Sequence, residues 1–444
     1  MKWLAFGMCI LVGVPLMTGL ASWSGFGRVL LIAMLLVSTV VKISVNFASL
    51  EEYRGPDRGF EVSLTDLIAV SLGLGLTISN WKNFRWLPMN LIPYLMLLGL
   101  SVMSVANAPD TQIAGFTIFK WLKTAFLYWT VFNCVWCDWP LEGMIAGIIG
   151  VGALETVIGL QQKYLYGMYR INGTFDHSNA IPAYFLLVLP ILICWLFAKR
   201  RSATVVCLGL GSSLGMCFVI AATMSRAGLA LMGLSVLSTL AYGLVKNPTL
   251  PKFGFAALMS LVMMIGGIKA LDSFIERFEN APKSSAEARD EFNTAAKLMA
   301  DDNWLGVGIN CFSRVMTEDQ RYRDSVHVMQ DEEHAGVCHH IYWLTAAEVG
   351  YVGMCLLITI FGRFIVTFLP CAIYADGEEG GLMFGVLIGS LSLHAVGLFE
   401  WVFRTTPVWN LFWITSAFGA ATVIRIKRRG ETPMCQQALL LQGS

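Results

Sequence analysis

The chain has 444 residues, of which 56% are hydrophobic and only 14% are charged, and its formal net charge is +1. Soluble domains carry roughly 25% charged residues, so this composition excludes an ordinary soluble protein. The basic residues are dispersed over short segments. The charge pattern therefore gives no indication of a nucleic-acid partner.

Apolar segments recur along the chain at about 17 to 25 residues, the length that a helix needs to cross a hydrocarbon core of about 30 Å. They predict twelve or thirteen spans and an all-α, polytopic integral membrane protein. The first segment has no basic region beyond Lys2 and no small-residue cleavage site, so we expect it to stay in the protein. The predicted spans are 3–22, 27–48, 64–79, 87–106, 113–136, 141–162, 179–197, 203–222, 227–245, 254–271, 340–369, 381–403 and 405–424.

One long polar interval interrupts these apolar segments and divides the chain into three parts. Transmembrane helices are predicted in 1–271, a large loop in 272–338, and further helices with a short cytoplasmic tail in 339–444. We expect the three parts to act as one integrated domain with its core at about 165–365. No repeat of 20 to 50 residues is present.

Basic residues in short loops predict the orientation of the chain, because they resist translocation across the membrane. They gather near 82–85, 199–201, 246–252 and 425–429, which lie on one side of the predicted spans. That side is predicted to be the cytoplasm, so the large loop is expected outside it. The side of the N-terminus depends on whether the chain has twelve or thirteen spans.

Three arginines are predicted near this outer side, at the ends of spans or in the large loop. Arg226 begins an apolar segment, Arg170 lies in the polar turn before another, and Arg289 precedes a segment of helical periodicity. Arginine keeps its charge, and its planar guanidinium pairs with two phosphate oxygens at once. Each arginine alone is compatible with an interfacial side chain or a solvated surface. Together they indicate a site for a phosphate or pyrophosphate head group.

His339 and His340 open the predicted span at 340–369. A histidine at the outer mouth of a helix titrates near neutral pH and can act as a general base. Upstream of this pair, Gly306 and Gly308 indicate a tight turn or a close approach of two backbones.

Two other kinds of function fit parts of this pattern. Zinc takes histidine and carboxylate ligands, but the chain has no His-Glu-x-x-His or His-x3-His pair. A transporter would also have many spans, but similar halves and polar residues at mid-membrane are expected of it, and the sequence shows neither. The residues that would supply metal ligands are His327, His334, His339, His340 and the acids at 331–333.

Four cysteines need separate comment. Cys134 and Cys137 form a Cys-x-x-Cys pair without a thioredoxin-like strand pattern, so we assign them no redox function. Cys311 and Cys338 both fall in the predicted outer interval, where disulfides persist. Our hypothesis is a disulfide between these two, which would tie the glycine turn to the base of His339.

Four motifs, taken together, resemble the O-antigen ligase and O-antigen polymerase family over about residues 60–420. Their order and shared outer location carry the resemblance, and the sequence departs from it at His340, where the family has Asn. The motifs are Arg170-x-x-Gly-x-Phe with Asn179, Ser225-Arg226-Ala-Gly, Arg289 followed by Gly306-Val-Gly308-x-x-x-Phe312, and His339-His-Ile-Tyr342 followed by Glu348-x-Gly350.

The resemblance implies an inverting, metal-independent glycosyl transfer in the bacterial inner membrane, with the active site facing the periplasm and no cofactor. The donor would be an undecaprenyl-pyrophosphate-linked glycan, and the acceptor a lipid or a saccharide. By the same resemblance, Arg226 and Arg289 would bind the donor pyrophosphate and Arg170 would support them. His339 is the preferred base and His340 the alternative. Ligase and polymerase share these residues and differ only in acceptor.

Overall fold

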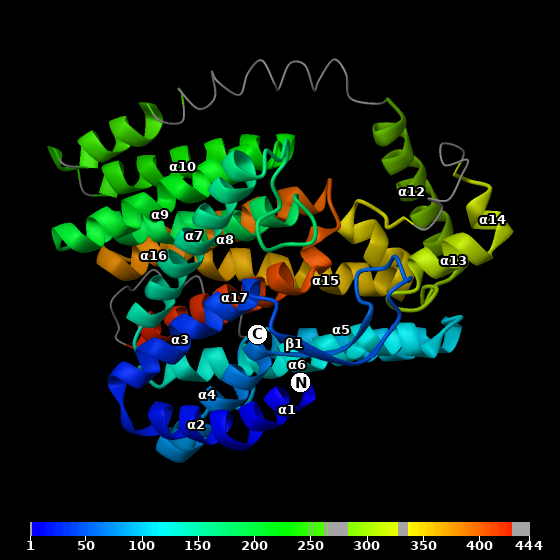
Figure 1. The fold of residues 1–444 in the computed structure, drawn as a ribbon, viewed down its shortest axis with the longest axis horizontal. Helices are drawn as coiled ribbons and strands as arrows, with labels where there is room; N and C mark the ends of the chain where they lie inside the picture. The colour runs from blue at the N-terminus through cyan, green and yellow to red at the C-terminus, as the bar shows by residue number, and fades with distance from the viewer. Residues whose placement is uncertain are drawn as a thin grey trace.

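The computed structural model describes residues 2–246, 248–250, 252–261, 264, 283–326 and 336–428, and of the side chains in 283–302 only those from Arg289 onward. This part of the chain is mostly helical (Figure 1). Its helices are α1 (Lys2–Met8), α2 (Val14–Trp23), α3 (Gly25–Val40), α4 (Leu64–Asn80), α5 (Leu91–Ser104), α6 (Thr111–Trp136), α7 (Glu142–Leu160), α8 (Ala180–Ala198), α9 (Ala203–Ala222), α10 (Arg226–Lys246), α12 (Lys283–Asp302), α13 (Phe312–Glu318), α14 (Gln320–Arg323), α15 (Ile341–Tyr374), α16 (Gly377–Gly397) and α17 (Thr406–Arg428). Short π and 3-10 segments adjoin them at Cys9–Gly13, Trp81–Asn83, Val105–Asn107, Gln161–Leu165 and Val402–Arg404.

Within the described residues, nine helical segments are long and apolar enough to cross a membrane. The prediction of a mostly helical protein with several such helices is confirmed, whereas twelve or thirteen spans of that length are not found there. Many of these helices expose large apolar side chains, as lipid-facing helices do. The nine are Lys2–Trp23, Leu64–Asn83, Glu142–Leu165, Ala180–Ala198, Ala203–Ala222, Arg226–Lys246, Ile341–Tyr374, Gly377–Gly397 and Thr406–Arg428; shorter apolar helices occupy Gly25–Val40, Leu91–Asn107 and Lys252–Leu261.

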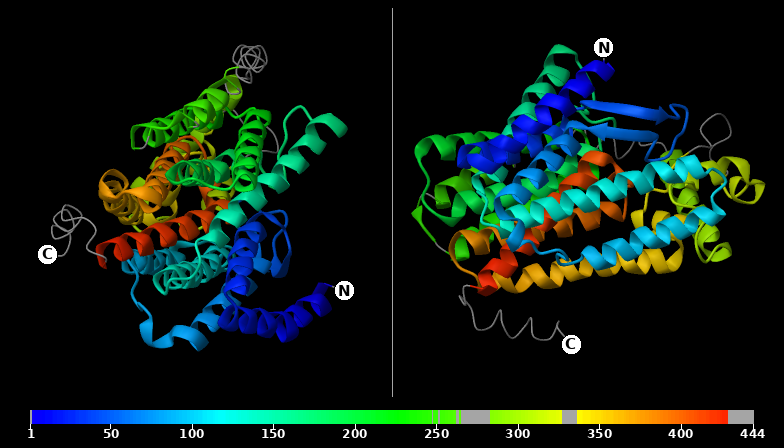
Figure 2. Two further views of the ribbon diagram at one scale, coloured as in Figure 1. Left: turned by 90° about the vertical axis from the view of Figure 1, so that its left-hand side faces the viewer. Right: turned by 90° about the horizontal axis from the view of Figure 1, so that it is seen from below.

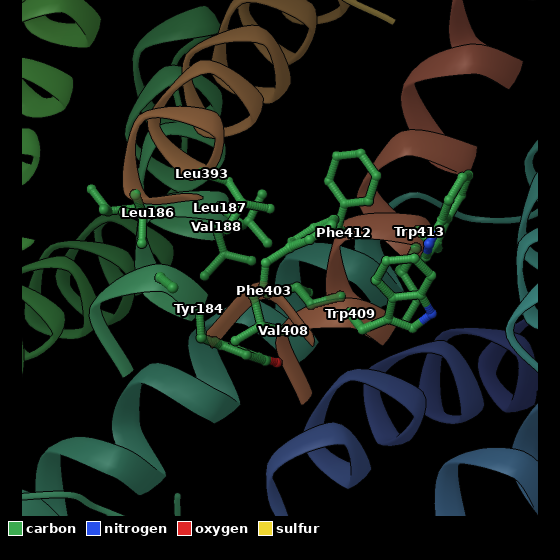
Figure 3. Packing of buried hydrophobic residues seen from close by; sticks show 14 of the residues in the cluster. Tyr184, Leu186, Leu187, Val188, Leu393, Phe403, Val408, Trp409, Phe412 and Trp413 are labelled. Atoms are coloured by element: carbon green, nitrogen blue, oxygen red, sulfur yellow. The ribbon is translucent and has the colours of Figure 1, made fainter. Parts of the chain in front are cut away.

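The centre of the molecule is formed by α8 and α17, whose residues are almost all buried (Figure 2). An aromatic cluster joins α17 to its neighbours, and Figure 3 shows Trp409, Phe412 and Trp413 packed beside Phe403. The Trp409 indole also stacks on Trp121 of α6, with ring centroids 5.0 Å apart. Such contacts between large rings contribute both buried area and a preferred geometry.

A seam of glycines brings α16 against α8 at backbone distance. Gly381, Gly385 and Gly389 recur every fourth residue and therefore lie on one face of α16. A Cβ on Gly385 would lie 2.6 Å from the Ile191 Cα, and one on Gly389 would lie 2.7 Å from the Leu187 carbonyl oxygen. Small residues at this spacing are what membrane helices use to approach closely.

The predicted span at 27–48 is wrong in its second half. The α3 helix ends at Val40, and the chain continues into β1 (Ser44–Ser49), which pairs antiparallel with β2 (Gly59–Ser63). The segment from Lys42 to Phe47 alternates polar and apolar residues, the period of a half-exposed strand rather than of a helix. The total hydropathy of the run obscured this alternation. The hairpin forms one wall of the cavity described below.

A break in α15 at Gly350 receives a turn from the preceding polar interval. Gly350 has φ 79° and ψ 171°, which interrupts the helical hydrogen bonding. The backbone N–H groups of Val307 and Gly308 donate to the carbonyls of Ala347 and Glu348 at 2.8 and 3.2 Å. Gly306 and Gly308 have φ of 76° and 103°. The predicted tight turn is therefore confirmed, and it docks on α15 just below His339.

Candidate functional site

The buried carboxylate of Glu400 gathers side chains from three other parts of the chain. Its Oε1 accepts hydrogen bonds from Asn179 Nδ2 at 2.6 Å and from Arg289 at 3.0 Å. Its Oε2 lies 3.3 Å from His339 Nδ1. Only 7% of the Glu400 side chain is exposed, against 37% for Arg289 and 22% for His339. The carboxylate is thus an internal hub, whereas the arginine and the histidine remain accessible.

The partners of Glu400 come from three different helices or the residues just before them. Glu400 lies in the connection between α16 and α17, and Asn179 immediately precedes α8. His339 lies two residues before α15, and Arg289 is on α12. Four elements far apart in the sequence therefore meet at one point, and two of the predicted site residues, Arg289 and His339, are brought together there.

Arg170 belongs to the same network through Asn179. Its guanidinium donates to the Asn179 side-chain oxygen, and its Nε donates to the Thr223 carbonyl at 2.7 Å. The first contact joins Arg170 indirectly to Glu400. The second holds the turn just before α10, which begins at Arg226 with an exposed side chain. The structure thus places Arg226 three residues from a contact of Arg170, at the margin of the network.

The two adjacent histidines occupy different positions. His340 is the N-cap of α15, where its Nδ1 accepts the backbone N–H of Trp343 at 3.3 Å. Burial lowers the pKa of His340, which keeps the ring neutral and able to accept this bond. His339 instead points its Nδ1 at Glu400. With a proton on Nδ1, the lone pair of His339 is on Nε2 and is available for base chemistry.

Charges around Glu400 set its protonation. Burial alone would raise the pKa of this carboxyl, but the hydrogen bond from His339 and the charge of Arg289 lower it further than burial raises it. The net result is a pKa below the ordinary 4.5. Glu400 is therefore an anion at neutral pH, and the ion pair with Arg289 is lost only as the pH falls through this lowered value.

His177 lies beside the network and has a lowered pKa. Burial is the largest cause, Glu400 opposes it, and the nearby cations Arg170 and Arg289 add to it. The His177 ring lies 6.0 Å from the Trp401 ring, and its Nδ1 accepts the backbone N–H of Asn179 at 3.2 Å. His177 is thus neutral at neutral pH and helps to fix the asparagine that binds Glu400.

A second buried polar cluster includes a residue of the same connection as Glu400 and fixes the position of that connection. Arg404 and Glu348, 1% and 0% exposed, form an ion pair at 3.0 Å. Lys120 donates to the Arg404 carbonyl at 2.7 Å and also pairs with Asp57 of the hairpin loop. Asn310 donates to the Asp57 carbonyl at 2.9 Å. These contacts tie the connection that carries Glu400 to α15, to α6 and to the hairpin.

Sequence reasoning missed Glu400. It was assigned to the end of the predicted span 381–403, but α16 ends at Gly397 and the next helix begins at Thr406. The signal was present in the letters Glu400-Trp-Val-Phe-Arg404, because two charges four residues apart at the end of an apolar run are costly unless they have partners. Asn179 enters the sequence analysis only within the motif of Arg170, and His177 does not enter it.

The predicted disulfide between Cys311 and Cys338 is wrong, because both thiols are free. The Cys338 thiol lies 3.1 Å from the Asn293 side-chain oxygen, and the Cys311 thiol lies 3.8 Å from the Asp110 carbonyl. Burial raises the pKa of both thiols to about 12. Little thiolate is therefore present to form a bond.

The metal alternative concerns residues that are largely outside the described part of the chain. His327, His334 and the acids at 331–333 all lie there. Among the described residues, no group of three or more histidine, cysteine, aspartate or glutamate side chains is arranged to hold a metal ion.

The chain matches no model of a known protein family and no curated protein sequence. What remains is the chemistry of the site itself: an ionised carboxylate, a histidine that contacts it, and one accessible arginine paired with the same carboxylate.

Proposed function

We propose that this protein is an inverting, metal-independent glycosyltransferase of the bacterial inner membrane. It would transfer a glycan from undecaprenyl pyrophosphate to a lipid or saccharide acceptor at the periplasmic face, as an O-antigen ligase or polymerase does. The observation that carries the proposal is that the two carboxylate oxygens of Glu400 contact Arg289 and His339, one each. One carboxylate thereby positions an anion-binding group and a candidate base side by side.

The reaction places a distinct demand on each of these groups. The acceptor oxygen attacks the anomeric carbon, and the bond from that carbon to the pyrophosphate oxygen breaks. The leaving pyrophosphate keeps the electron pair and gains negative charge. Arg289, which is one-third exposed, and the exposed Arg226 are suited to stabilise this charge, because arginine binds phosphate oxygens in pairs.

His339 receives the proton of the acceptor hydroxyl in this proposal. A neutral imidazole with its Nδ1–H directed at a carboxylate is held in one tautomer and orientation, and the carboxylate stabilises the imidazolium that forms. Glu400 is ionised and buried, as this role requires. His340 caps α15 through the nitrogen that faces the helix, which favours His339 as the base.

The test is transfer by purified protein in lipid nanodiscs, with undecaprenyl-pyrophosphate-linked glycan as donor. We expect His339→Ala to lower kcat by about 10²- to 10⁴-fold, the usual contribution of a general base. Arg289→Ala should raise the donor KM and lower kcat. Arg314→Ala is the matched control, because this arginine of α13 is exposed and pairs only with Glu318 among the described residues.

Two results would contradict the proposal. One is full transfer by the Arg289→Ala protein, and the other is a wild-type protein that never releases undecaprenyl pyrophosphate. Complementation of a null strain separates the two acceptors. Accumulation of full-length lipid-linked polymer in the His339→Ala strain indicates a ligase, whereas accumulation of single repeats indicates a polymerase.

A further inference from the structure

A cavity of about 530 Å³, lined by both polar and apolar side chains, opens between the β-hairpin, α6 and the start of α17. Its lining includes Trp401 and His177, which are the immediate neighbours of Glu400 and Asn179 in the network described above. The cavity therefore borders the candidate site directly, although none of the predicted site residues lines it.

The hairpin wall presents unused hydrogen-bonding groups to the cavity. Three polar residues of the hairpin line the cavity: Asn46 of β1, Glu61 of β2, and Arg58 of the loop between the strands. No side-chain hydrogen bond or ion pair of these three is formed with any residue that the structure describes. The Asn46 amide and the Glu61 carboxylate belong to paired residues of the two strands, and together with the Arg58 guanidinium they offer both donors and acceptors.

Charge balance in the cavity argues against a polyanionic ligand. Three lysines line it, and each has a carboxylate partner: Lys42 with Asp176, Lys120 with Asp57, and Lys123 with Asp66. Arg58 is the one lining cation that has no such partner among the described residues. A pyrophosphate would find little net positive charge in this cavity.

Aromatic rings complete a lining suited to sugar rings. Trp401 and Phe119 both line the cavity and are both partly exposed. Pockets that combine a few placed polar groups with aromatic surface fix the orientation of a polar ligand. A saccharide has hydroxyl groups that both donate and accept, and apolar ring faces that contact aromatic side chains.

We propose that this cavity binds the saccharide of the acceptor. The inference rests on the proposed function, and it adds the place from which the attacking hydroxyl arrives. Inversion requires attack from the side opposite the leaving pyrophosphate. In Figure 1, α10 and α12, which carry Arg226 and Arg289, lie above α15, and the β-hairpin lies below it. An acceptor in the cavity would thus lie on the other side of α15 from these two helices in this view.

Direct binding tests the inference without relying on turnover. The probes are two oligosaccharides from the source organism, the delipidated core and the repeat unit released from its lipid carrier by mild acid, and undecaprenyl pyrophosphate alone. Dissociation constants are measured for wild type, Arg58→Ala and Thr406→Trp, which places a bulky ring in the cavity. Arg54→Ala is the matched control, because Arg54 is exposed on the same loop but does not line the cavity.

We expect one of the oligosaccharides to bind the wild-type protein. It should bind Arg58→Ala at least about tenfold more weakly, the effect of losing a charged hydrogen bond, and it should also bind Thr406→Trp more weakly, because the new ring occupies the cavity. Arg54→Ala should bind it as wild type does, and undecaprenyl pyrophosphate should bind all four proteins equally. Failure of both oligosaccharides to bind the wild type, or equal binding by the Arg58→Ala protein, overturns the inference. Weaker binding of undecaprenyl pyrophosphate by the cavity variants assigns the cavity to the donor and overturns it too.

These outcomes are distinct from failure of the proposed function. If Arg289→Ala does not weaken the binding of undecaprenyl pyrophosphate and the wild type transfers nothing, the glycosyltransferase proposal fails. Oligosaccharide binding that depends on Arg58 would then still establish a saccharide site in this cavity.

Discussion

At the scale of single residues, the adjacent histidines His339 and His340 make different contacts. His340 completes the first turn of α15, whereas His339 lies beside a buried anion. An unsatisfied N–H at a helix start costs free energy, so the cap is expected to contribute to stability rather than to chemistry.

Replacement of the two histidines should separate these tasks. His340→Ala is expected to lower the free energy of unfolding by about 1 kcal/mol and to leave kcat nearly unchanged. His339→Ala should do the reverse. His340→Asn provides the control, because asparagine caps helices well and should restore the stability. Loss of activity by the His340→Ala protein at an unchanged melting temperature would contradict this assignment.

The candidate site was only partly predictable from the letters of the sequence. Arginines and histidines at the ends of apolar segments are conspicuous, because charge near a membrane is expensive. Glu400 was not conspicuous, because it lies within an apolar run whose pattern predicts a continuous membrane helix. Its importance depends on which helix ends meet in space, and this is decided by packing between elements that are distant in sequence.

At the scale of elements, the break in α15 at Gly350 is where the turn at 306–308 contacts this helix. The carbonyl of Trp304 lies where a side chain on Gly350 would begin, with 2.0 Å between that oxygen and a Cβ placed there. The hydropathy pattern of 340–369 predicted one long helix and contained no sign of a break other than the glycine itself. The strands were missed for the converse reason, because their short alternation was hidden in a long apolar run.

Adding a methyl group at Gly350 tests whether the turn is held against α15. Gly350→Ala should destabilise the protein by about 1–3 kcal/mol from the backbone conformation alone, and the clash with Trp304 should add to this. Gly362→Ala is the control in the same helix, because a Cβ there meets nothing within 4 Å. Thermal unfolding of both variants in detergent is the measurement. Equal melting temperatures would show that the turn is not held against α15.

At the scale of the whole molecule, buried charges join segments that the sequence keeps far apart. The Glu348–Arg404 pair links α15 to the connection before α17, and Lys120 extends this link to the hairpin loop. A buried pair is costly to break, because removing one partner leaves an uncompensated charge.

Arg404→Met is therefore expected to lower the free energy of unfolding by about 3–5 kcal/mol. The double variant Arg404→Met with Glu348→Leu should recover much of this loss, because it removes both charges. Denaturant titration of the single and double variants gives the comparison. A double variant that is no more stable than Arg404→Met would indicate that Glu348 matters mainly through its contact with the Phe312 amide.

The glycine seam between α8 and α16 constrains the geometry of the candidate site. Asn179 immediately precedes α8, and Glu400 follows α16 by three residues, so the two ends of one hydrogen bond are mounted on helices that touch backbone to backbone. Helices in such contact have no room to slide or rotate past one another. The spacing between Asn179 and Glu400 is thereby fixed before any substrate arrives. If the proposed substrate binds at this point, lock-and-key recognition is expected there, with any induced fit confined to α12, which carries Arg289.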